Sequence, residues 1–269
     1  MTTLDRRPIG VFDSGIGGLT VVRALMERLP FEDIIYFGDS ARVPYGVKSI
    51  ATIEQFTRQI AEFLLKREVK ALIIACNTMA AVAADVVREV AGEIPVLDVI
   101  EAGAQAAVAE SQTGSIAVIA TPTTVNSNAY ARAIHGLNAE ARVYSQACPL
   151  FVPLVEEGWL DHPVTRLTAE EYLRPILVED VDTLVLGCTH YPLLKPLLQD
   201  VCGGKMSIVD SATTTAEAAA QQLARLNLLN PQRQEPSYQY YVTDIPLRFQ
   251  TIGERFLGRS IRQLEMVKL

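Results

Sequence analysis

The sequence predicts an α/β protein of two similar domains, each with a mostly parallel sheet, related to one another by pseudo-twofold symmetry. Short apolar runs of strand length alternate with longer amphipathic stretches, which is the pattern of consecutive βαβ units. The run ALIIACNT at Ala71–Thr78 resembles TLVLGCTH at Thr183–His190, and in each a cysteine follows the apolar residues. The two cysteines are 112 positions apart, and Ile94–Asp98 and Met206–Asp210 keep the same spacing. This shared register indicates an internal duplication.

The first half of the chain begins with a strand and a glycine-rich turn at Asp13–Gly18, which leads into a helix. A polar segment at Gly38–Ser49 follows the second strand as a loop. In the next helix, Ile53, Phe56 and Ile60 recur at the three- and four-residue spacing of one helix face. We expect strands at 9–12, 34–37, 71–75 and 96–99, and helices at about 19–29, at about 50–67 and from about 78.

The second half repeats this alternation. Pro192 falls in the first turn of a helix, where a missing backbone N–H costs little. We expect strands at 115–120, 142–146 and 183–187, and helices at about 101–110, 127–134 and 168–179 and after Pro192. Two last helices, at about 213–226 and 246–258, are assigned to the first domain, so that the domains comprise residues 1–98 plus 208–269 and residues 99–207. The active site is expected at the interface of the two domains.

The composition is that of a chain with sizeable cores. Of the 269 residues, 49% are hydrophobic and 20% are charged, which excludes a disordered chain. The 24 basic and 31 acidic side chains give a net charge of −7, which argues against nucleic acid or an anionic membrane as a partner. The sequence shows no secretion signal and no apolar stretch of membrane-spanning length. We therefore expect a soluble, cytoplasmic protein.

The four cysteines are expected to be free thiols. They include no CxxC pair, and a cytoplasmic chain of this size does not need covalent cross-links. Cys148 and Cys202 are interpreted as small core residues, which is the ordinary state of a buried cysteine. Cys76 and Cys188 differ, because each stands at the carboxyl end of a predicted strand and opens a predicted helix.

Parallel α/β sheets bind their ligands at that position. The free N–H groups and the dipole of a helix start favour anions, so they should lower the pKa of Cys76 and Cys188 toward neutrality and hold a substrate carboxylate. Two equivalent thiols suit a reaction that needs an acid and a base on opposite sides of one carbon. Racemisation is such a reaction.

Other chemistries use fewer of these residues. A metal site is not expected, because the chain has only 3 histidines and no ligand pair at C-x2–4-C spacing. A cysteine hydrolase could use Cys188 with His190 as its base, but Cys76 would then have no role. A non-catalytic amino-acid-binding module of the periplasmic type would need an export signal. The turn at Asp13–Gly18 lacks the third glycine of a dinucleotide fingerprint and the Lys-Ser/Thr pair of a phosphate loop.

Five separated segments resemble the glutamate racemase family, in the same order. They are VFDSGIGGL at 11–19, GDSARVPYG at 38–46, ACNT at 75–78, CPLFVPLVE at 148–156 and GCTHYP at 187–192. The resemblance extends from about residue 8 to about residue 258, with Ser40 standing where many members have Thr. Aspartate racemases, the alternative within the wider family, tend to carry an acidic residue where this chain has His190. Glutamate is therefore favoured as the substrate.

The resemblance implies an enzyme that interconverts L- and D-glutamate without pyridoxal phosphate or any other cofactor and supplies D-glutamate for peptidoglycan. Cys76 would remove the α-proton of D-glutamate while Cys188 protonates the opposite face, and the roles would reverse for L-glutamate. Asp13 would assist Cys76, and His190 with Glu156 would assist Cys188. The implied substrate-binding residues are Asp13, Ser14, Pro44, Tyr45, Gly46, Asn77, Thr78, Thr121, Thr189 and His190.

The resemblance also implies two kinds of partner besides glutamate. Members of the family commonly form homodimers, and a cell-wall precursor such as UDP-N-acetylmuramoyl-L-alanine is a candidate activator. Neither property can be deduced from the residues themselves.

Overall fold

The structure, a computed structural model, describes residues 5–231, 234–244 and 247–269. Two sequence-based expectations fall partly outside these ranges. They are the absence of a secretion signal, which concerns the start of the chain, and the helix predicted at 246–258, whose first residue is not described. The strands are β1 (Ile9–Asp13), β2 (Ile34–Gly38), β3 (Ala71–Ile74), β4 (Val96–Asp98), β5 (Ser115–Ala120), β6 (Arg142–Ala147), β7 (Thr183–Gly187), β8 (Ser207–Asp210), β9 (Tyr238–Val242) and β10 (Leu264–Met266).

Helices fill most of the connections between these strands. They are α1 (Leu19–Arg28), α2 (Ile50–Leu65), α3 (Asn77–Ala91), α4 (Val99–Glu110), α5 (Pro122–Asn126), α6 (Ala129–Leu137), α7 (Phe151–Glu156), α8 (Pro163–Leu177), α9 (Lys195–Val201), α10 (Ser211–Arg225) and α11 (Leu247–Leu257). Short 3-10 turns occur at η1 (Ser40–Arg42), η2 (Tyr45–Val47) and η3 (Tyr191–Leu194).

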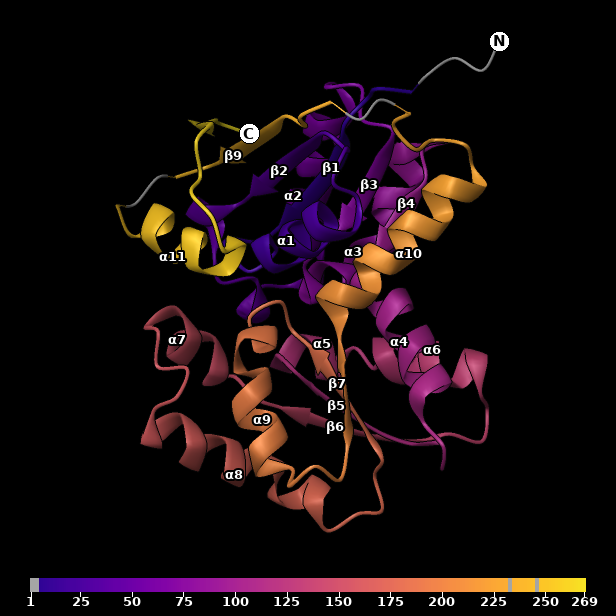
Figure 1. Cartoon of the computed structure of the whole chain (residues 1–269), viewed down its shortest axis with the longest axis vertical. Helices are drawn as coiled ribbons and strands as arrows, with labels where there is room; N and C mark the ends of the chain where they lie inside the picture. Colours follow the sequence, from indigo (N-terminus) through magenta and orange to yellow (C-terminus); the bar gives the residue numbers. More distant parts are fainter. Residues whose placement is uncertain (1–4, 232–233, 245–246) are drawn as a thin grey trace.

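Two parallel sheets lie one above the other along the long axis of the molecule (Figure 1). Within the described residues, the first sheet has the order β10-β9-β2-β1-β3-β4 and the second the order β6-β5-β7-β8. The order β2-β1-β3-β4 therefore reappears as β6-β5-β7-β8. The predicted α/β class with two similar parallel sheets is confirmed, and each predicted strand appears within two residues of its expected ends.

The two aspartates in the 112-residue register have the same structural role. Asp98 is the N-cap of α4, and its Oδ1 accepts hydrogen bonds from the N–H groups of Ile100 and Glu101, each at 2.9 Å. Asp210 is the N-cap of α10, and its Oδ1 accepts from the N–H of Ala212 at 2.9 Å. A carboxylate at this position satisfies N–H groups that the first helical turn leaves unbonded. The repeated sequence thus encodes a repeated strand-to-helix junction.

Several elements differ from the sequence-based expectation. The helix predicted at about 127–134 corresponds to α6, which begins at Ala129 because Asn128 before it adopts a left-handed conformation with φ of 56°. The short helix α5, just before Ser127, was not predicted. The helix predicted at 168–179 begins earlier, at Pro163, where the side chain of His162 caps the N–H of Val164. Strands β9 and β10 were not predicted, since the tyrosine-rich β9 and the three-residue β10 both lack an apolar run of strand length.

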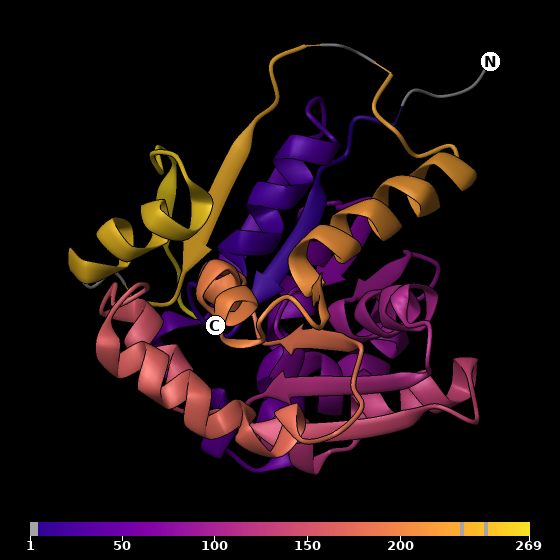
Figure 2. The same ribbon diagram turned by 60° about the horizontal axis from the view of Figure 1, so that its bottom comes forward.

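The C-terminal segment belongs to the first sheet, although it follows the second sheet in sequence. Strand β9, drawn in yellow-orange, lies beside the indigo N-terminal elements in Figure 2 and pairs with β2. Helix α11 packs on α1. This arrangement supports the assignment of the last helices to the first half. The domain limits of 1–98 plus 208–269 and of 99–207 stay a prediction.

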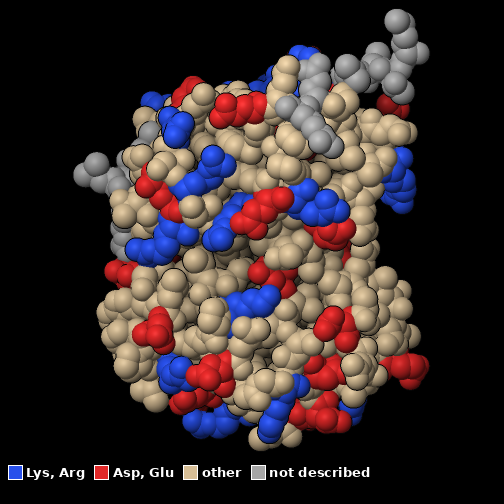
Figure 3. Space-filling model, in the orientation of Figure 1, with Lys and Arg blue, Asp and Glu red and all other residues tan. Residues whose placement is uncertain are grey.

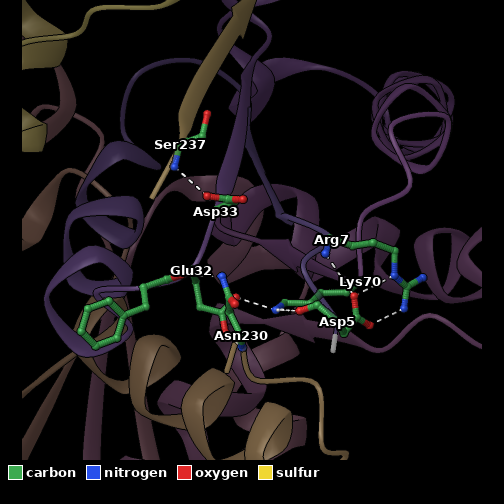
Figure 4. A network of polar contacts seen from close by, with 8 residues as sticks. Asp5, Arg7, Glu32, Asp33, Lys70, Asn230 and Ser237 are labelled. Atoms are coloured by element: carbon green, nitrogen blue, oxygen red, sulfur yellow. Dashed lines mark hydrogen bonds and ion pairs between the residues drawn. The ribbon is translucent and has the colours of Figure 1, made fainter. Parts of the chain in front are cut away.

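A buried ion pair closes the amino end of the first sheet, away from the thiols (Figure 4). Lys70, fully buried just before β3, pairs with Glu32 at 2.5 Å and donates to the carbonyl of Asp5 at 3.3 Å. Oε1 of Glu32 also accepts from the N–H of Asn230 at 2.6 Å. Loss of one partner would leave a buried, unpaired charge, which costs about 3–5 kcal/mol. The network is thus part of what holds the sheet in place.

The surface carries charges of both signs. On the face drawn in Figure 3, Lys and Arg side chains alternate with Asp and Glu and do not gather into a basic patch. Among the helices of the described residues, none is both long and apolar enough to cross a membrane.

Candidate active site

A cavity of about 450 Å³ is lined by residues that follow strands of both sheets. Every residue of the predicted site lies in its wall, and their separate roles stay predictions. These residues are Asp13, Ser14, Pro44, Tyr45, Gly46, Cys76, Asn77, Thr78, Thr121, Glu156, Cys188, Thr189 and His190. No cluster of three or more metal-ligating side chains occurs in the part of the chain that the structure describes.

Cys76 enters the cavity from the first sheet, where it follows β3 and is the N-cap of α3. Its Sγ donates a hydrogen bond to Oγ of Ser14 at 3.5 Å. Burial raises the pKa of Cys76 to about 11, and the charge of Asp13 adds to this effect, while the Ser14 hydroxyl and the N–H of Met79 oppose it. At neutral pH the free enzyme therefore holds Cys76 as a thiol.

Cys188 enters from the second sheet, directly after β7. Its Sγ is 3.9 Å from Nδ1 of His190, whose Nε2 is 3.1 Å from Oε1 of Glu156. The ring of Phe256 meets the imidazole edge-on, with 5.0 Å between the centroids. Burial raises the pKa of Cys188 above its usual range, and the N–H of His190 only partly offsets this. The second thiol thus lies beside an imidazole, which in turn contacts a carboxylate.

The prediction that helix starts lower the pKa of both thiols is wrong. At Cys76 the start of α3 is present, but the loss of hydration outweighs the stabilisation of a thiolate by N–H groups. At Cys188 the long helix is missing, because the 3-10 turn η3 comes first and α9 begins only at Lys195. Each thiol therefore needs a further positive or proton-accepting partner before it can act as a base.

Asp13 ends β1 at the wall of the cavity and is buried. Its Oδ1 accepts a hydrogen bond from the N–H of Gly15 at 2.8 Å. Burial raises the pKa of Asp13, while the N–H of Gly15 and the charge of His190 lower it by less. A carboxyl group with a raised pKa accepts a proton more readily than an exposed one, which suits a partner of a thiol.

The loop at 39–48 forms a wall of the cavity through Tyr45, and a buried carboxylate holds it in place. Asp39, which is not accessible to solvent, accepts hydrogen bonds from the hydroxyl of Tyr45 and, at 2.8 Å, from the hydroxyl of Thr243. It also pairs with Arg42 at 2.6 Å. Because Thr243 follows β9, this network ties the loop to the C-terminal segment.

Contacts across the interface fix the residues that follow each thiol. Oδ1 of Asn77 accepts a hydrogen bond from the hydroxyl of Tyr130 at 2.7 Å, and the hydroxyl of Thr20 donates to the carbonyl of Thr189 at 3.0 Å. Gly17 allows the second approach, because a Cβ there would lie 2.2 Å from Oγ1 of Thr189. Each half thus holds the thiol-bearing segment of the other.

Sequence reasoning missed these supporting residues. Tyr130 and Thr20 are distant in sequence from the groups they hold, and no local pattern marks them. The same is true of Phe249 and Ile252, which line the cavity from α11. Only Asp39 had a signal, since it lies within the segment GDSARVPYG.

Known proteins match the chain along most of its length. A family model described as Asp/Glu/Hydantoin racemase matches residues 9–219. The chain belongs to this family. A glutamate racemase from Syntrophus aciditrophicus is 69% identical over 265 residues, which cover 98% of each chain. The crystal structure of glutamate racemase from Francisella tularensis in complex with D-glutamate has a TM-score of 0.93 and 49% identity, with 98% of each chain covered.

Glutamate racemisation is therefore the activity of this family member, which is an isomerase with the family's role in peptidoglycan synthesis. The hydrolase and the binding module are excluded, and the aspartate alternative is not supported. A more distant relative, the Escherichia coli glutamate racemase, is 27% identical with a TM-score of 0.77, over 97% of this chain and 98% of its own. Its structure contains L-glutamate and the activator UDP-MurNAc-ala.

Proposed function

We propose that the enzyme racemises glutamate by a two-base mechanism in which Cys76 and Cys188 exchange protons with opposite faces of the α-carbon. One observation carries this proposal: both thiols line one cavity, each after the equivalent strand of its own sheet. With D-glutamate, the Cys76 thiolate takes the α-proton and the Cys188 thiol gives its proton to the other face. The result is L-glutamate, a Cys76 thiol and a Cys188 thiolate, and the reverse reaction restores the first state.

The substrate and the neighbouring side chains supply what the buried thiols lack. A thiolate in this cavity is unfavourable by itself, since burial raises the pKa of Cys76 to about 11. The α-ammonium group of glutamate, held beside a thiolate, favours the charged form. Asp13 assists proton removal from Cys76, and His190 with Glu156 does so at Cys188. An enclosed site that excludes water strengthens each of these interactions.

Neutral donors bind the two carboxylates of the substrate in this proposal. The described cavity wall contains no Lys or Arg, whereas hydroxyl, amide and backbone N–H groups are present on both sides. Fixed donors of this kind also stabilise charge that develops on the carboxylate as the α-proton leaves. The proposed donors are among Ser14, Tyr45, Gly46, Asn77, Thr78, Thr121, Thr189 and His190. Asp13 and Pro44 complete the proposed substrate-binding residues, and no cofactor enters the steps.

The wider setting follows from the role in peptidoglycan synthesis. We place the enzyme in the cytoplasm and take D- and L-glutamate as its substrate and product. A homodimer and activation by a UDP-N-acetylmuramoyl-L-alanine precursor complete the proposal, the second supported by the complex of the Escherichia coli relative. Turnover with and without this precursor, and sedimentation at working concentration, test these two points.

Incubation of the protein with L-glutamate in D2O tests the mechanism. Two bases predict that the first D-glutamate formed carries deuterium at the α-carbon, while the remaining L-glutamate keeps its proton. L-aspartate, incubated in parallel, should show no exchange. Equal deuterium content in substrate and product from the earliest time points would indicate a single base and contradict the proposal.

A further inference from the structure

Tyr130 contacts the segments that carry both thiols. We propose that it is a positioning residue for substrate binding, whose hydroxyl fixes the side-chain amide of Asn77 so that Nδ2 donates into the cavity. This inference rests on the two-thiol site proposed above and adds to it a residue that lies outside the cavity wall.

The hydrogen bond between the two side chains sets the direction of the amide. The hydroxyl of Tyr130 donates to Oδ1 of Asn77 at 2.7 Å and is 3.4 Å from the carbonyl of Val99. Both side chains are 2% exposed. Because Oδ1 is occupied by Tyr130, the Nδ2 group on the other side of the amide is directed away from it.

That Nδ2 group has no partner among the described residues, although it is buried and Asn77 lines the cavity. A buried donor without an acceptor costs free energy, so it marks a place where a ligand oxygen is expected. A carboxylate of glutamate is such an acceptor. Asn77 directly follows Cys76, so the donor belongs to the same segment as the thiol that takes the α-proton of D-glutamate, and both residues line the cavity.

Two glycines keep the space that the ring of Tyr130 occupies. A Cβ at Gly187 would lie 3.0 Å from Cε2 of the ring, and a Cβ at Gly103 would lie 3.2 Å from its Cε1 and from its hydroxyl oxygen. Gly187 directly precedes Cys188. One rigid side chain therefore packs against the second thiol segment and directs the amide of the first.

A double-mutant cycle of Tyr130→Phe and Asn77→Ala tests this role with both enantiomers of glutamate. Tyr130→Phe should lower kcat/KM by about tenfold, the effect of losing one well-placed hydrogen bond, with most of the change in KM. In the Asn77→Ala background the same substitution should have no further effect, because the group that it orients is gone. Fully additive losses would overturn the assignment.

Tyr191→Phe is the matched control. Tyr191 is also fully buried, and its hydroxyl donates to a backbone carbonyl, that of Cys148, at 2.8 Å, outside the cavity wall. This variant should keep KM for glutamate within about twofold, because the loss of this hydrogen bond lowers the free energy of unfolding but does not alter substrate binding. A rise in KM equal to that of Tyr130→Phe would reduce Tyr130 to an ordinary buried hydroxyl and overturn the proposal.

Gly103→Ala perturbs Tyr130 without altering it. Alanine favours a helix more than glycine does, so the melting temperature should not fall, while the crowded ring shifts the hydroxyl and KM for glutamate rises. Normal KM in both Gly103→Ala and Tyr130→Phe would contradict the inference. If KM for glutamate is raised in Asn77→Ala but normal in Tyr130→Phe, this inference is wrong and the proposed function is unaffected. The two-base mechanism is tested separately, by the D2O labelling of the unmodified enzyme.

Discussion

The two thiol sites share a backbone plan but differ in the groups that surround the sulfur atoms. Both cysteines follow an interior strand of a parallel sheet, β3 in one half and β7 in the other. Around Cys76 the nearby groups are the hydroxyl of Ser14, at 3.5 Å, and the carboxyl of Asp13. Around Cys188 the nearby group is the imidazole of His190, at 3.9 Å, which Glu156 contacts in turn.

This difference teaches that the repeated scaffold places the two sulfur atoms, while the side chains beside each of them are specific to that half. A chiral substrate presents different groups to the two halves, so equal surroundings would not serve both faces equally well. At one thiol the partner is an acid whose pKa is raised by burial, and at the other it is an imidazole. The comparison predicts that both thiols are essential, while their partners act by different means.

The largest expected effect is that of removing either sulfur atom. Cys76→Ala and Cys188→Ala should each lower racemisation by at least about 10³-fold, since a positioned acid or base is lost. Because two enantiomers have equal free energies, kcat/KM must fall equally in both directions, which polarimetry from either enantiomer measures. Near-normal turnover in either variant would contradict the two-base mechanism.

Cys202→Ala is the control for this pair of variants. Cys202 is also buried, but it lies outside the described cavity wall. Its replacement should leave kcat/KM within about twofold, and a melting curve should show that all three variants remain folded.

The next largest effect is expected in a variant whose thiol becomes more reactive while its turnover falls. Asp13→Asn removes a negative charge that raises the pKa of Cys76, so this pKa should fall from about 11 and more thiolate should be present at pH 9. Iodoacetamide should therefore modify Cys76 faster, as mass spectrometry of the labelled peptide would show. Racemisation should nevertheless fall by about 10²-fold, because the proton acceptor is lost.

His190→Asn sharpens the contrast between the two halves. It should lower racemisation to a similar extent, but the labelling rate of Cys76 should stay unchanged, because His190 contacts the other thiol. Slower labelling of Cys76 in Asp13→Asn would show that the carboxyl does not raise the pKa of this thiol.

The strands and the thiols could be predicted from the sequence because they depend on local patterns. Apolar runs define the interior strands, and the duplicated segments place Cys76 and Cys188 at their carboxyl ends. Strand β9, which lies between β2 and the edge strand β10, escaped prediction because its sequence YQYYV contains no continuous apolar run. Apart from the two cysteines and Thr121, the predicted residues of the cavity wall were found through the five matching segments, not through any pattern of hydrophobicity or charge.

The supporting contacts and the thiol pKa values could not be predicted in this way. Tyr130 is 53 positions from Asn77, and Thr20 is 169 positions from Thr189, so only the packed fold brings them together. The pKa of Cys76 depends on a balance between a helix start, visible in the sequence, and burial, which is not. Because burial outweighs the helix start, the pKa of Cys76 is raised, and the predicted lowering was wrong.

The smallest effect concerns the space between the halves rather than a reacting group. In Gly17→Ala the new Cβ would lie 2.2 Å from Oγ1 of Thr189 and 2.7 Å from the ring of His190, so the imidazole must move away from Cys188. Turnover should fall by about tenfold, and overpacking should cost about 1–3 kcal/mol in urea unfolding. Gly136→Ala, in α6 with no neighbour within 4 Å, should instead raise stability by about 0.5–1 kcal/mol and leave turnover unchanged. If Gly17→Ala were as stable and active as Gly136→Ala, the close contact between the halves would have no part in placing His190.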